Sequence, residues 1–398
     1  MTRRRLLIVT PQFPFPPSWG FGIRVYQLAR QLSRGYDVTL LSYIRRDQLG
    51  AVPTLEEEIG SVQVVEHDER EGTARRLLQL RCLISAAPFQ LREWYSDELQ
   101  CAVDAVLSES DFSAVLLESS QLASLRFPKA VKVVLDEHNI EYELLDRMQA
   151  TERSPLRRFY NWTEFRKFRP VEQRAWQRAD GVTVTSERER SLVRASVPSA
   201  DVVVAPNAVD TEHFCPTGRA VTPGSLVFVG LLTYRPNLDA VDFLLNDILP
   251  QVESRRDVCV TVVGAGARED LDRLRRPNVF VTGEVSDVRP FLEEAAVAVV
   301  PVRMGGGTRF KVLEALAMGT PVVSTSTGCE GLHVEHDRHL LVADTADAFA
   351  TSVHALLDDP SRAAALASAG RALMSLEYSW ERSASSIREL LDRLVPEH

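Results

Sequence analysis

Short apolar runs recur along the chain and alternate with segments in which apolar residues repeat every three or four positions. In the first half, the runs LLIVT, DVTLLSY, AVLLE, VKVVLD, GVTVT and DVVVA have the length and the β-branched content of buried strands. The segment from about Arg24 to Ser33, between the first two runs, has helical spacing. Strands that alternate with helices predict a parallel sheet with crossover helices.

A second series of the same kind begins after PNAVD at Pro206. Its apolar runs are SLVFVG, VCVTVVGAG, NVFVTG, AAVAVVPV and TPVVS, with helices expected from about Leu238 and from about Arg309. Two consecutive α/β series predict two Rossmann-like, doubly wound domains that face each other across a cleft. Ligands of such sheets bind at the carboxyl ends of the strands.

The length of 398 residues exceeds what one hydrophobic core usually supports, which agrees with two domains. We place an N-terminal domain at residues 1–204 and a C-terminal domain at residues 205–379, with the segment from Val204 to Thr222 as the expected linker. A helix expected within residues 380–398 has room to return to the first domain.

Composition narrows the class of protein. Hydrophobic residues make up 45% of the chain and charged residues 25%, which is the balance of a folded globular protein. A net charge of −9 argues against a nucleic-acid-binding protein, which needs a basic surface. The five cysteines form no CxxC pair, and the opening segment holds too few apolar residues for a signal peptide or a membrane span. We therefore expect a cytoplasmic protein with reduced thiols.

One stretch departs from the acidic balance. Residues 151–180 contain eight Arg or Lys against four Asp or Glu, with aromatic residues interleaved. One interpretation is a solvated helical face whose aromatic rings pack inward. The other is a peripheral contact with the inner face of a membrane or with an anionic acceptor.

The segment from Gly305 to Val323, GGGTRFKVLEALAMGTPVV, carries the clearest chemical signal. It follows the run AAVAVVPV, so its glycines lie at a strand-to-helix turn that permits close approach of a ligand. A helix that starts near Arg309 directs free N–H groups and the positive end of its dipole toward this turn, which suits a diphosphate. Arg309 and Lys311 place cations in a first turn where the helix itself disfavours them, and an anionic partner explains that placement.

Glu314 lies one turn further along this helix, where its carboxylate can accept hydrogen bonds from sugar hydroxyls. Two plainer interpretations stay open. Glu314 can be an exposed helix carboxylate, because Val312, Leu313 and Leu316 define the buried side. The glycines from Gly305 to Gly307 can be only a flexible turn.

Several motifs occur in the order found in the retaining GT-B glycosyltransferases of family 4, which use nucleotide-sugar donors. The resemblance involves nearly the whole chain. The motifs are PPxxGxxxR from Pro16 to Arg24, DEHNIEYE from Asp136, PNAVD from Pro206, VFVGLLTYRPNLDAV, VVGAG, VTGEVSD, EALAxGTPV and TGCEGL. Their joint order is more specific than any single motif.

The resemblance implies roles for individual residues. Gly20 and Gly22 would form a loop that touches the donor phosphates or sugar, and His138 would lie by the transferred sugar, although a core or turn histidine is the alternative. Glu314 matches the second glutamate of the family's E-x7-E motif, and the backbone at Val285 would lie near the base. The predicted catalytic set is His138, Arg309, Lys311 and Glu314, and the predicted donor-binding set is Gly20, Gly22, Arg24, Gly230, Arg235, Val285, Gly305, Gly306, Gly307 and Thr308.

The chain departs from the family pattern at three positions. Gly306 stands where the first glutamate of E-x7-E often contacts the donor sugar. Leu231 and Pro236 stand where the motif GRLxxxKG commonly supplies an arginine and a lysine for the diphosphate. We hypothesise that Arg309 and Lys311 replace those charges, as in GGGTRxK variants of the family.

We expect neither a metal ion nor another cofactor. The resemblance implies metal-independent catalysis, and we identify no metal motif of the kind used by the other main glycosyltransferase fold. His333, His336 and His339 form an HxxHxxH series, but this stretch reads as loop and strand, and histidine spacing alone does not build a tetrahedral site.

The resemblance therefore implies an enzyme that transfers a sugar, with retention of configuration, from a nucleotide diphosphate-sugar. UDP is the expected nucleotide, and the acceptor is a hydroxyl of a glycan, a lipid-linked glycan or a small molecule. Two alternatives stay open. A nucleotide-sugar epimerase shares the architecture but needs more proton-transfer groups than His138 supplies. A non-catalytic GT-B partner protein would fit the missing glutamate at Gly306.

Overall fold

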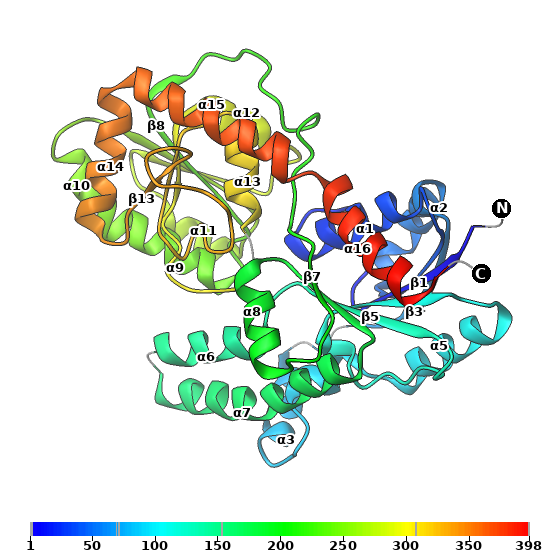
Figure 1. Cartoon of the computed structure of the whole chain (residues 1–398). Helices are drawn as coiled ribbons and strands as arrows, with labels where there is room; N and C mark the ends of the chain where they lie inside the picture. Colours follow the sequence, from blue (N-terminus) through cyan, green and yellow to red (C-terminus); the bar gives the residue numbers. More distant parts are fainter. Residues whose placement is uncertain (1–2, 69, 71, 153, 307–308, 397–398) are drawn as a thin grey trace. The chain divides into compact units, whose positions relative to one another are not determined.

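The computed structural model describes residues 3–68, 70, 72–152, 154–306 and 309–396, and its contacts divide the chain into two compact units. The first unit comprises Met1–Pro206 with Trp380–His398, and the second unit comprises Asn207–Ser379 (Figure 1). Each unit contains one parallel sheet with helices in its crossover connections. The expected pair of doubly wound, Rossmann-like α/β sheets is therefore confirmed.

Seven parallel strands form the sheet of the first unit, in the order β3-β2-β1-β4-β5-β6-β7. The strands are β1 (Arg5–Thr10), β2 (Asp37–Ile44), β3 (Ser61–Glu66), β4 (Ala114–Glu118), β5 (Lys132–Glu137), β6 (Gly181–Val184) and β7 (Val202–Val204). Leu6, Leu7, Ile8 and Val9 of β1 have no exposed surface. A strand that is buried on both faces needs apolar residues at every position, which explains the continuous run LLIV.

Nine α-helices have bounds within the first unit as the structure describes it. They are α1 (Gly20–Leu32), α2 (Val52–Ile59), α3 (Gly72–Leu83), α4 (Phe89–Trp94), α5 (Asp97–Glu109), α6 (Glu141–Thr151), α7 (Pro155–Arg178), α8 (Glu187–Ser196) and α16 (Trp380–Leu394), with the 3₁₀ helices η1 (Arg46–Ala51) and η2 (Ser120–Leu122). The last helix, α16, packs against α1, β6 and β7. Gly181 of β6 permits this close packing, because a Cβ there would lie 2.9 Å from Leu390.

Six parallel strands form the sheet of the second unit, in the order β10-β9-β8-β11-β12-β13. The strands are β8 (Thr222–Val229), β9 (Cys259–Val263), β10 (Val279–Gly283), β11 (Ala295–Val300), β12 (Val322–Ser324) and β13 (Leu341–Val342). In the register of the central strands, Val227 of β8 lies opposite Thr261 of β9 and Ala298 of β11.

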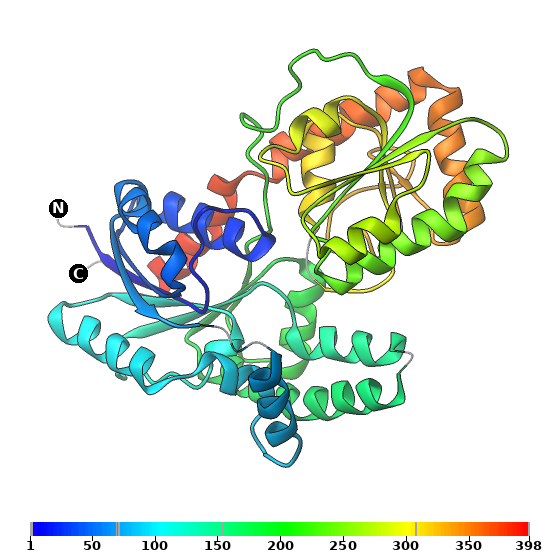
Figure 2. The ribbon, with the colours of Figure 1, turned by 180° about the vertical axis from the view of Figure 1, so that it is seen from behind.

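Helices lie on both faces of the second sheet (Figures 1 and 2). They are α9 (Arg235–Phe243), the π-helical η3 (Leu244–Ile248), α10 (Leu249–Glu253), α11 (Arg268–Leu274), α12 (Arg289–Glu293), α13 (Phe310–Ala317), α14 (Ala346–Asp358) and α15 (Pro360–Glu377). A Cβ on Gly370 of α15 would lie 2.6 Å from Leu316, so glycine sets the packing distance of α15 on α13. No helix within the described ranges has both the length and the apolarity to cross a membrane.

Two helices begin earlier than the sequence predicts. α1 begins at Gly20 rather than near Arg24, because glycines in the first turn weaken the helical pattern that marks its start. α9 begins at Arg235 rather than near Leu238. Pro236 fits the first turn of α9, where a missing N–H costs nothing and a fixed φ favours the helix.

Candidate functional site

The carboxyl edge of the second sheet gathers the predicted donor-site residues of that unit. β8 is followed by Gly230, and β11 is followed by the loop that leads to α13. Because β8 pairs with β9 on one side and with β11 on the other, the chain reverses its winding direction at this point of the sheet. Doubly wound sheets bind their ligands at such a switch point.

The first turn of α13 lies at this edge. Arg309 is the N-cap residue, and its Nη1 donates a hydrogen bond to the carbonyl of Gly306 (2.6 Å). Gly305 has a φ of +116°, and a Cβ there would lie 2.7 Å from Nη2 of Arg309. The predicted residues Gly307 and Thr308 lie outside the described residues. The helix N-terminus and the guanidinium together make this turn suitable for an anion.

The Lys311 ammonium reaches from α13 to the connection between β8 and α9. It donates a hydrogen bond to Oδ1 of Asn237 (2.7 Å) and lies 4.2 Å from the centre of the Phe228 ring. A Cβ on Gly230 would lie 2.7 Å from Nζ of Lys311, so a glycine leaves room for the ammonium. The positive charge of Lys311 thus stands beside the segment that lacks the arginine and lysine of the GRLxxxKG pattern.

Burial shifts the pKa values of both ionisable side chains of α13, Lys311 and Glu314, toward 7. Burial, reinforced by the charge of Arg309, lowers the pKa of Lys311 to about 7, while Glu314 acts in the opposite direction. Burial likewise raises the pKa of Glu314 to about 7, against the opposing influence of Lys311. Both side chains stay partly accessible to solvent, so a ligand can reach them and shift their protonation.

The remaining predicted residues of the second unit border the same edge. Arg235 is the half-buried first residue of α9, and Val285 follows β10 and packs against the hydrophobic core. Gly264, after β9, has a φ of +151°, and a Cβ there would lie only 2.0 Å from the carbonyl oxygen of Gly230. The ends of β8 and β9 are therefore packed backbone to backbone.

In the first unit, Arg24 is buried in an ion pair. Its guanidinium donates hydrogen bonds to both oxygens of Asp136 (2.7 and 2.8 Å) and to the carbonyl of Ala205 (2.9 Å), and its side chain is 1% exposed. Burial favours the neutral form of Asp136, but the Arg24 charge outweighs it and lowers the pKa of Asp136 to about 2. Arg24 therefore fixes the end of β5 from within the core, although the sequence predicts it in the donor-binding set.

His138 follows β5 and lies between two carboxylates and an aromatic ring. Its Nε2 is 2.6 Å from Oε2 of Glu118 and 3.4 Å from Oδ2 of Asp136, and the Phe21 ring stacks on the imidazole with centroids 4.3 Å apart. Burial and the Asp136 charge raise the pKa of Glu118 well above its usual range, and burial lowers the pKa of His138 to about 4.

These pKa shifts favour one protonation pattern. A protonated Glu118 donates to Nε2 of a neutral His138, which leaves the ring proton on Nδ1. Nδ1 is buried and has no hydrogen-bond partner among the described residues. It is therefore a donor that no described group satisfies.

Gly20 and Gly22 lie in the first turn of α1 and not in a loop. A Cβ on Gly22 would lie 3.1 Å from the Trp19 ring, so this glycine lets the ring pack on the helix. Phe21, between the two glycines, is the residue that stacks on His138. The structure thus joins the PPxxGxxxR and DEHN motifs in one cluster at the carboxyl end of the first sheet.

The sequence did not identify four of the residues that shape these two clusters. Phe21 and Asn237 contact predicted site residues, but their types carry no signal on their own. Glu118 ends the apolar run AVLLE, and an acidic residue at the end of a buried strand is a signal that could have revealed it. Ser119 has a φ of +83°, a strained value for a residue other than glycine and one that gathers at functional sites.

One group of side chains has the composition of a metal site. Glu118, Asp136 and His138 each place one candidate ligand atom within 4.8 Å of the others. The Asp136 carboxylate, however, already accepts hydrogen bonds from the Arg24 guanidinium and the Thr183 hydroxyl. A guanidinium that is hydrogen-bonded to this carboxylate repels a further cation. The cluster therefore fits an ion pair better than a metal ion.

The HxxHxxH series does not converge on one point. Nδ1 of His336 accepts a hydrogen bond from the N–H of Val342. Nδ1 of His339 accepts one from the N–H of Glu335, and Nδ1 of His333 lies 3.1 Å from the Glu377 carboxylate. The rings of His336 and His339 thus hold the backbone around β13 through hydrogen bonds.

Both units match models of glycosyltransferase families. Residues 20–213 match the model described as Glycosyltransferase Family 4, and residues 223–359 match the model described as Glycosyl transferases group 1. The two matched segments span most of the chain. The two matches together support a glycosyltransferase of the family 4 type. Within this chain, His138 lies in the first matched segment and Glu314 in the second.

Two curated relatives show how similar the sequence is to known proteins. The chain is 29% identical over 260 residues to the GDP-mannose-dependent alpha-(1-6)-phosphatidylinositol monomannoside mannosyltransferase of Mycobacterium tuberculosis. That match covers 58% of the chain and 66% of the relative, so the chain spans slightly under two thirds of the relative's length. It is also 23% identical over 368 residues to an uncharacterized 44.6 kDa protein in the cps region of Klebsiella pneumoniae, with coverage of 88% and 90%.

Solved structures resemble the chain over nearly its full length. Sucrose-phosphate synthase from Thermosynechococcus elongatus superposes with a TM-score of 0.72 at 17% identity, covering 98% of this chain and 99% of the other. Anabaena HepE in complex with UDP superposes with a TM-score of 0.67 at 14% identity, covering 98% and 100%. At these identities the likeness shows the fold, which is GT-B.

Proposed function

We propose that this chain transfers a sugar from a nucleotide diphosphate-sugar to a hydroxyl group of an acceptor, with retention of configuration. The observation that carries the proposal is the placement of Lys311. Its ammonium stands at the switch point of the second sheet, beside Gly230, and its side chain comes from the same first turn of α13 that Arg309 caps. This is the place where a doubly wound sheet binds phosphates, and the charge compensates for the cations missing from the β8–α9 connection.

The proposed reaction needs positive charge where the leaving diphosphate gains negative charge. Arg309, Lys311 and the N-terminal end of α13 supply that charge in a fixed geometry. The bond between the anomeric carbon and the phosphate oxygen breaks as the acceptor oxygen bonds to the same face of that carbon. The acceptor proton passes to the leaving phosphate oxygen. The proposed mechanism therefore uses no protein nucleophile, no metal ion and no other cofactor.

Two further residues have roles in this proposal. The Glu314 carboxylate, half-buried one turn into α13, accepts hydrogen bonds from hydroxyls of the donor. Nδ1 of His138 donates a hydrogen bond to a hydroxyl of the transferred sugar, because Glu118 holds the ring proton on that nitrogen. Both roles concern binding and orientation rather than covalent chemistry.

The nucleotide and the acceptor are the finer parts of the proposal. The sequence favours UDP, whereas the Mycobacterium tuberculosis relative is named as GDP-mannose-dependent, so a UDP-sugar and GDP-mannose are the two candidate donors. The same relative is named for a phosphatidylinositol mannoside, which adds weight to a lipid-linked acceptor over a soluble glycan or a small molecule.

A thermal-shift panel of UDP, GDP, ADP and TDP tests the proposed donor site. We expect one diphosphate to raise the melting temperature of the native protein by several degrees, because a ligand that binds only the folded state stabilises it. Glu314→Ala should reduce that shift, since it removes the carboxylate that accepts the donor's hydroxyls. Glu269→Ala, on the exposed face of α11, is the matched control and should preserve the shift. An absence of shift with all four nucleotides would favour the non-catalytic GT-B partner.

The pKa of Lys311 predicts how donor binding depends on pH. A bound diphosphate favours the charged ammonium and raises its pKa above the value of about 7 in the free protein. Affinity for the nucleotide-sugar should therefore be highest below pH 7 and fall by up to tenfold per pH unit as the pH rises above it. Titration calorimetry between pH 6 and pH 9 measures this fall.

Variants identify the group that titrates. Lys311→Met should remove the alkaline fall along with much of the affinity. Glu314→Gln should retain the fall, because the ammonium is still present. An affinity of the native protein that stays constant from pH 6 to pH 9 would exclude Lys311 as the titrating contact.

A further inference from the structure

An apolar and basic surface on α3 and the first half of α7 has no role in the proposed sugar transfer. Six of the eleven large apolar side chains exposed in the described ranges lie there. They are Leu77 (50%), Leu80 (61%) and Ile84 (94%) on and just after α3, and Leu156 (82%), Phe159 (58%) and Trp162 (40%) on α7. Each trio repeats every three or four residues, so each helix carries an apolar stripe. We use the name α3–α7 surface for these six residues together with the exposed arginines Arg76, Arg81, Arg157 and Arg158.

The two helices lie side by side. The Lys167 ammonium of α7 donates hydrogen bonds to the carbonyls of Cys82 (2.5 Å) and Leu83 (3.3 Å) at the C-terminal end of α3. Figures 1 and 2 show α3 next to α7 in both views. The two stripes therefore belong to one region of the first unit, although about 70 residues separate them in the chain.

The charge of this region is opposite to that of the whole chain. Residues 72–92 contain four arginines and no acidic residue, and residues 155–169 contain five basic residues and only Glu164. Glu164 is buried and accepts a hydrogen bond from the N–H of Phe89, so it does not offset the surface charge. The chain as a whole carries a net charge of −9.

Several of these arginines carry charge that no carboxylate within the described ranges neutralises. Arg76, Arg81, Arg157 and Arg158 are exposed, and none of them forms an ion pair with a carboxylate of the part that the structure describes. Elsewhere, exposed arginines are commonly paired, as Arg219 is with Glu294. Unpaired cations among exposed apolar side chains indicate a partner that is anionic and apolar at once.

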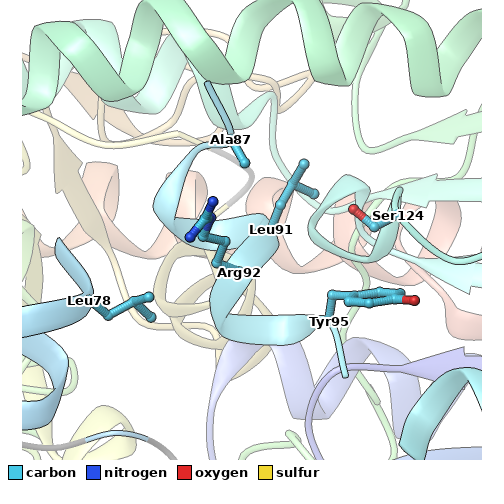
Figure 3. A pocket seen from close by; sticks show the side chains of 6 residues that line it. All are labelled: Leu78, Ala87, Leu91, Arg92, Tyr95 and Ser124. Atoms are coloured by element: carbon cyan, nitrogen blue, oxygen red, sulfur yellow. The ribbon is translucent and has the colours of Figure 1, made fainter. Parts of the chain in front are cut away.

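A hollow beside the surface has the same character. It lies beside α3 and α4 and has a volume of about 330 Å³ (Figure 3). Its lining consists of Leu78, Ala87, Leu91, Arg92, Tyr95 and Ser124. Leu78 of α3 and Leu91 of α4 contribute its apolar walls. The mixed lining extends the α3–α7 surface toward η2.

We propose that the α3–α7 surface docks on a phospholipid bilayer that contains anionic lipids. The apolar stripes would enter the boundary between headgroups and acyl chains, while the arginines would lie at the level of the phosphates. Trp162 suits this boundary, because its ring stacks with Phe159 and lies under the Arg166 guanidinium, 5.1 Å from it. The acidic remainder of the chain would be repelled by the same lipids, which orients the first unit with this surface toward the membrane.

The structure also narrows the basic stretch singled out in the sequence. Phe168 and Trp176, in the second half of α7, are buried and pack in the first unit. The large apolar side chains that α7 exposes lie in its first half, whereas the exposed residues of its second half include Arg169, Arg174 and Arg178. The helix α3, which the sequence pattern does not single out, supplies the other apolar stripe of the surface. This proposal does not depend on the sugar-transfer activity.

Sedimentation of the full-length protein with vesicles tests the proposal. The native protein should bind vesicles of phosphatidylcholine mixed with phosphatidylglycerol and bind pure phosphatidylcholine weakly. The fourfold variant Arg76→Gln, Arg81→Gln, Arg157→Gln and Arg158→Gln should lower the partition coefficient on the order of 1000-fold. A control with the same change in net charge, Arg255→Gln, Arg268→Gln, Arg273→Gln and Arg275→Gln in the second unit, should bind as the native protein does, because those side chains are exposed but lie outside the surface.

A second variant separates apolar insertion from charge. Leu80→Ser, Ile84→Ser and Leu156→Ser should weaken vesicle binding at least tenfold, whereas Phe280→Ser and Leu376→Ser, exposed in the second unit, should not. Failure of the native protein to bind anionic vesicles would overturn the proposal, as would an equal loss in the control variants. Sedimentation without lipid adds one further outcome: a native dimer that the surface variants dissociate would assign the surface to a second copy of the chain instead.

Discussion

Replacement of Asp136 by alanine should lower the free energy of unfolding of the first unit by about 3–5 kcal/mol, because it leaves the buried Arg24 guanidinium without its counter-charge. The two side chains are 0% and 1% exposed, so solvent cannot compensate for the lost carboxylate. Urea unfolding followed by tryptophan fluorescence measures the change. The effect is large because the charge, and not only a hydrogen bond, loses its partner.

Two variants show whether the lost charge is the cause. Asp111→Ala removes an exposed carboxylate of the same unit and should change stability by less than about 0.5 kcal/mol. Arg24→Met combined with Asp136→Asn removes both charges and should recover much of the loss. A cost below about 1 kcal/mol for Asp136→Ala alone would mean that Arg24 does not depend on this ion pair.

Loss of the Lys311 charge should have the largest effect on the proposed activity. Lys311→Met keeps most of the side chain but removes the ammonium, and we expect donor affinity to fall about 10- to 100-fold, the value of a hydrogen bond to a charged group. The rate of transfer should fall further, by about 100- to 1000-fold, because the diphosphate gains charge as it leaves. Arg309→Ala should act in the same direction. Calorimetry and turnover with the identified donor measure the two effects separately.

The matched control lies at the opposite edge of the same sheet. Arg255 precedes β9, at the amino end of the strands, so Arg255→Met removes one positive charge of the second unit away from the switch point. It should change donor affinity less than threefold. Equal losses in Lys311→Met and Arg255→Met would indicate a general effect of net charge. Unchanged affinity in Lys311→Met would show that this lysine does not replace the missing cations of the β8–α9 connection.

The sequence was sufficient for the sheets because strands buried on both faces have a local signature. The run LLIV of β1 and the run AVAVV of β11 are continuous and short, and the confirmed sheets follow from such runs. The predicted starts of α1 and α9 lie several residues after the observed starts. The reason is that Gly20, Gly22 and Pro236 disfavour helix interiors yet are tolerated in a first turn. The preferences of a residue type alone do not say where in a helix it stands.

The candidate site was less accessible to sequence reasoning because its contacts are long-range. Lys311 lies 74 residues from Asn237, and Arg24 lies 112 residues from Asp136. A motif can show that Arg24 belongs to a functional region. Only the structure shows that its side chain points from α1 into the core, toward Asp136. The resemblance points to His138. The acidic end of the run AVLLE marks Glu118 as unusual, but its contact with His138 is visible only once β4 and β5 lie side by side.

The second unit shows how one arrangement of charge can replace another. The pattern GRLxxxKG would supply cations from the connection between β8 and α9. Here Lys311 comes from α13 and reaches that connection through Asn237, with Gly230 leaving space for the ammonium. In the proposed function, the position of positive charge at the switch point is preserved while the element that supplies it changes.

Hydrogen exchange with and without the stabilising nucleoside diphosphate tests most directly whether α13 holds the donor. We expect slower exchange in peptides that cover Phe310–Ala317 and the connection from Gly230 to Asn237, because a bound diphosphate would accept hydrogen bonds from the first turn of α13. Unchanged exchange in these peptides, with protection elsewhere or nowhere, would contradict the proposed donor site.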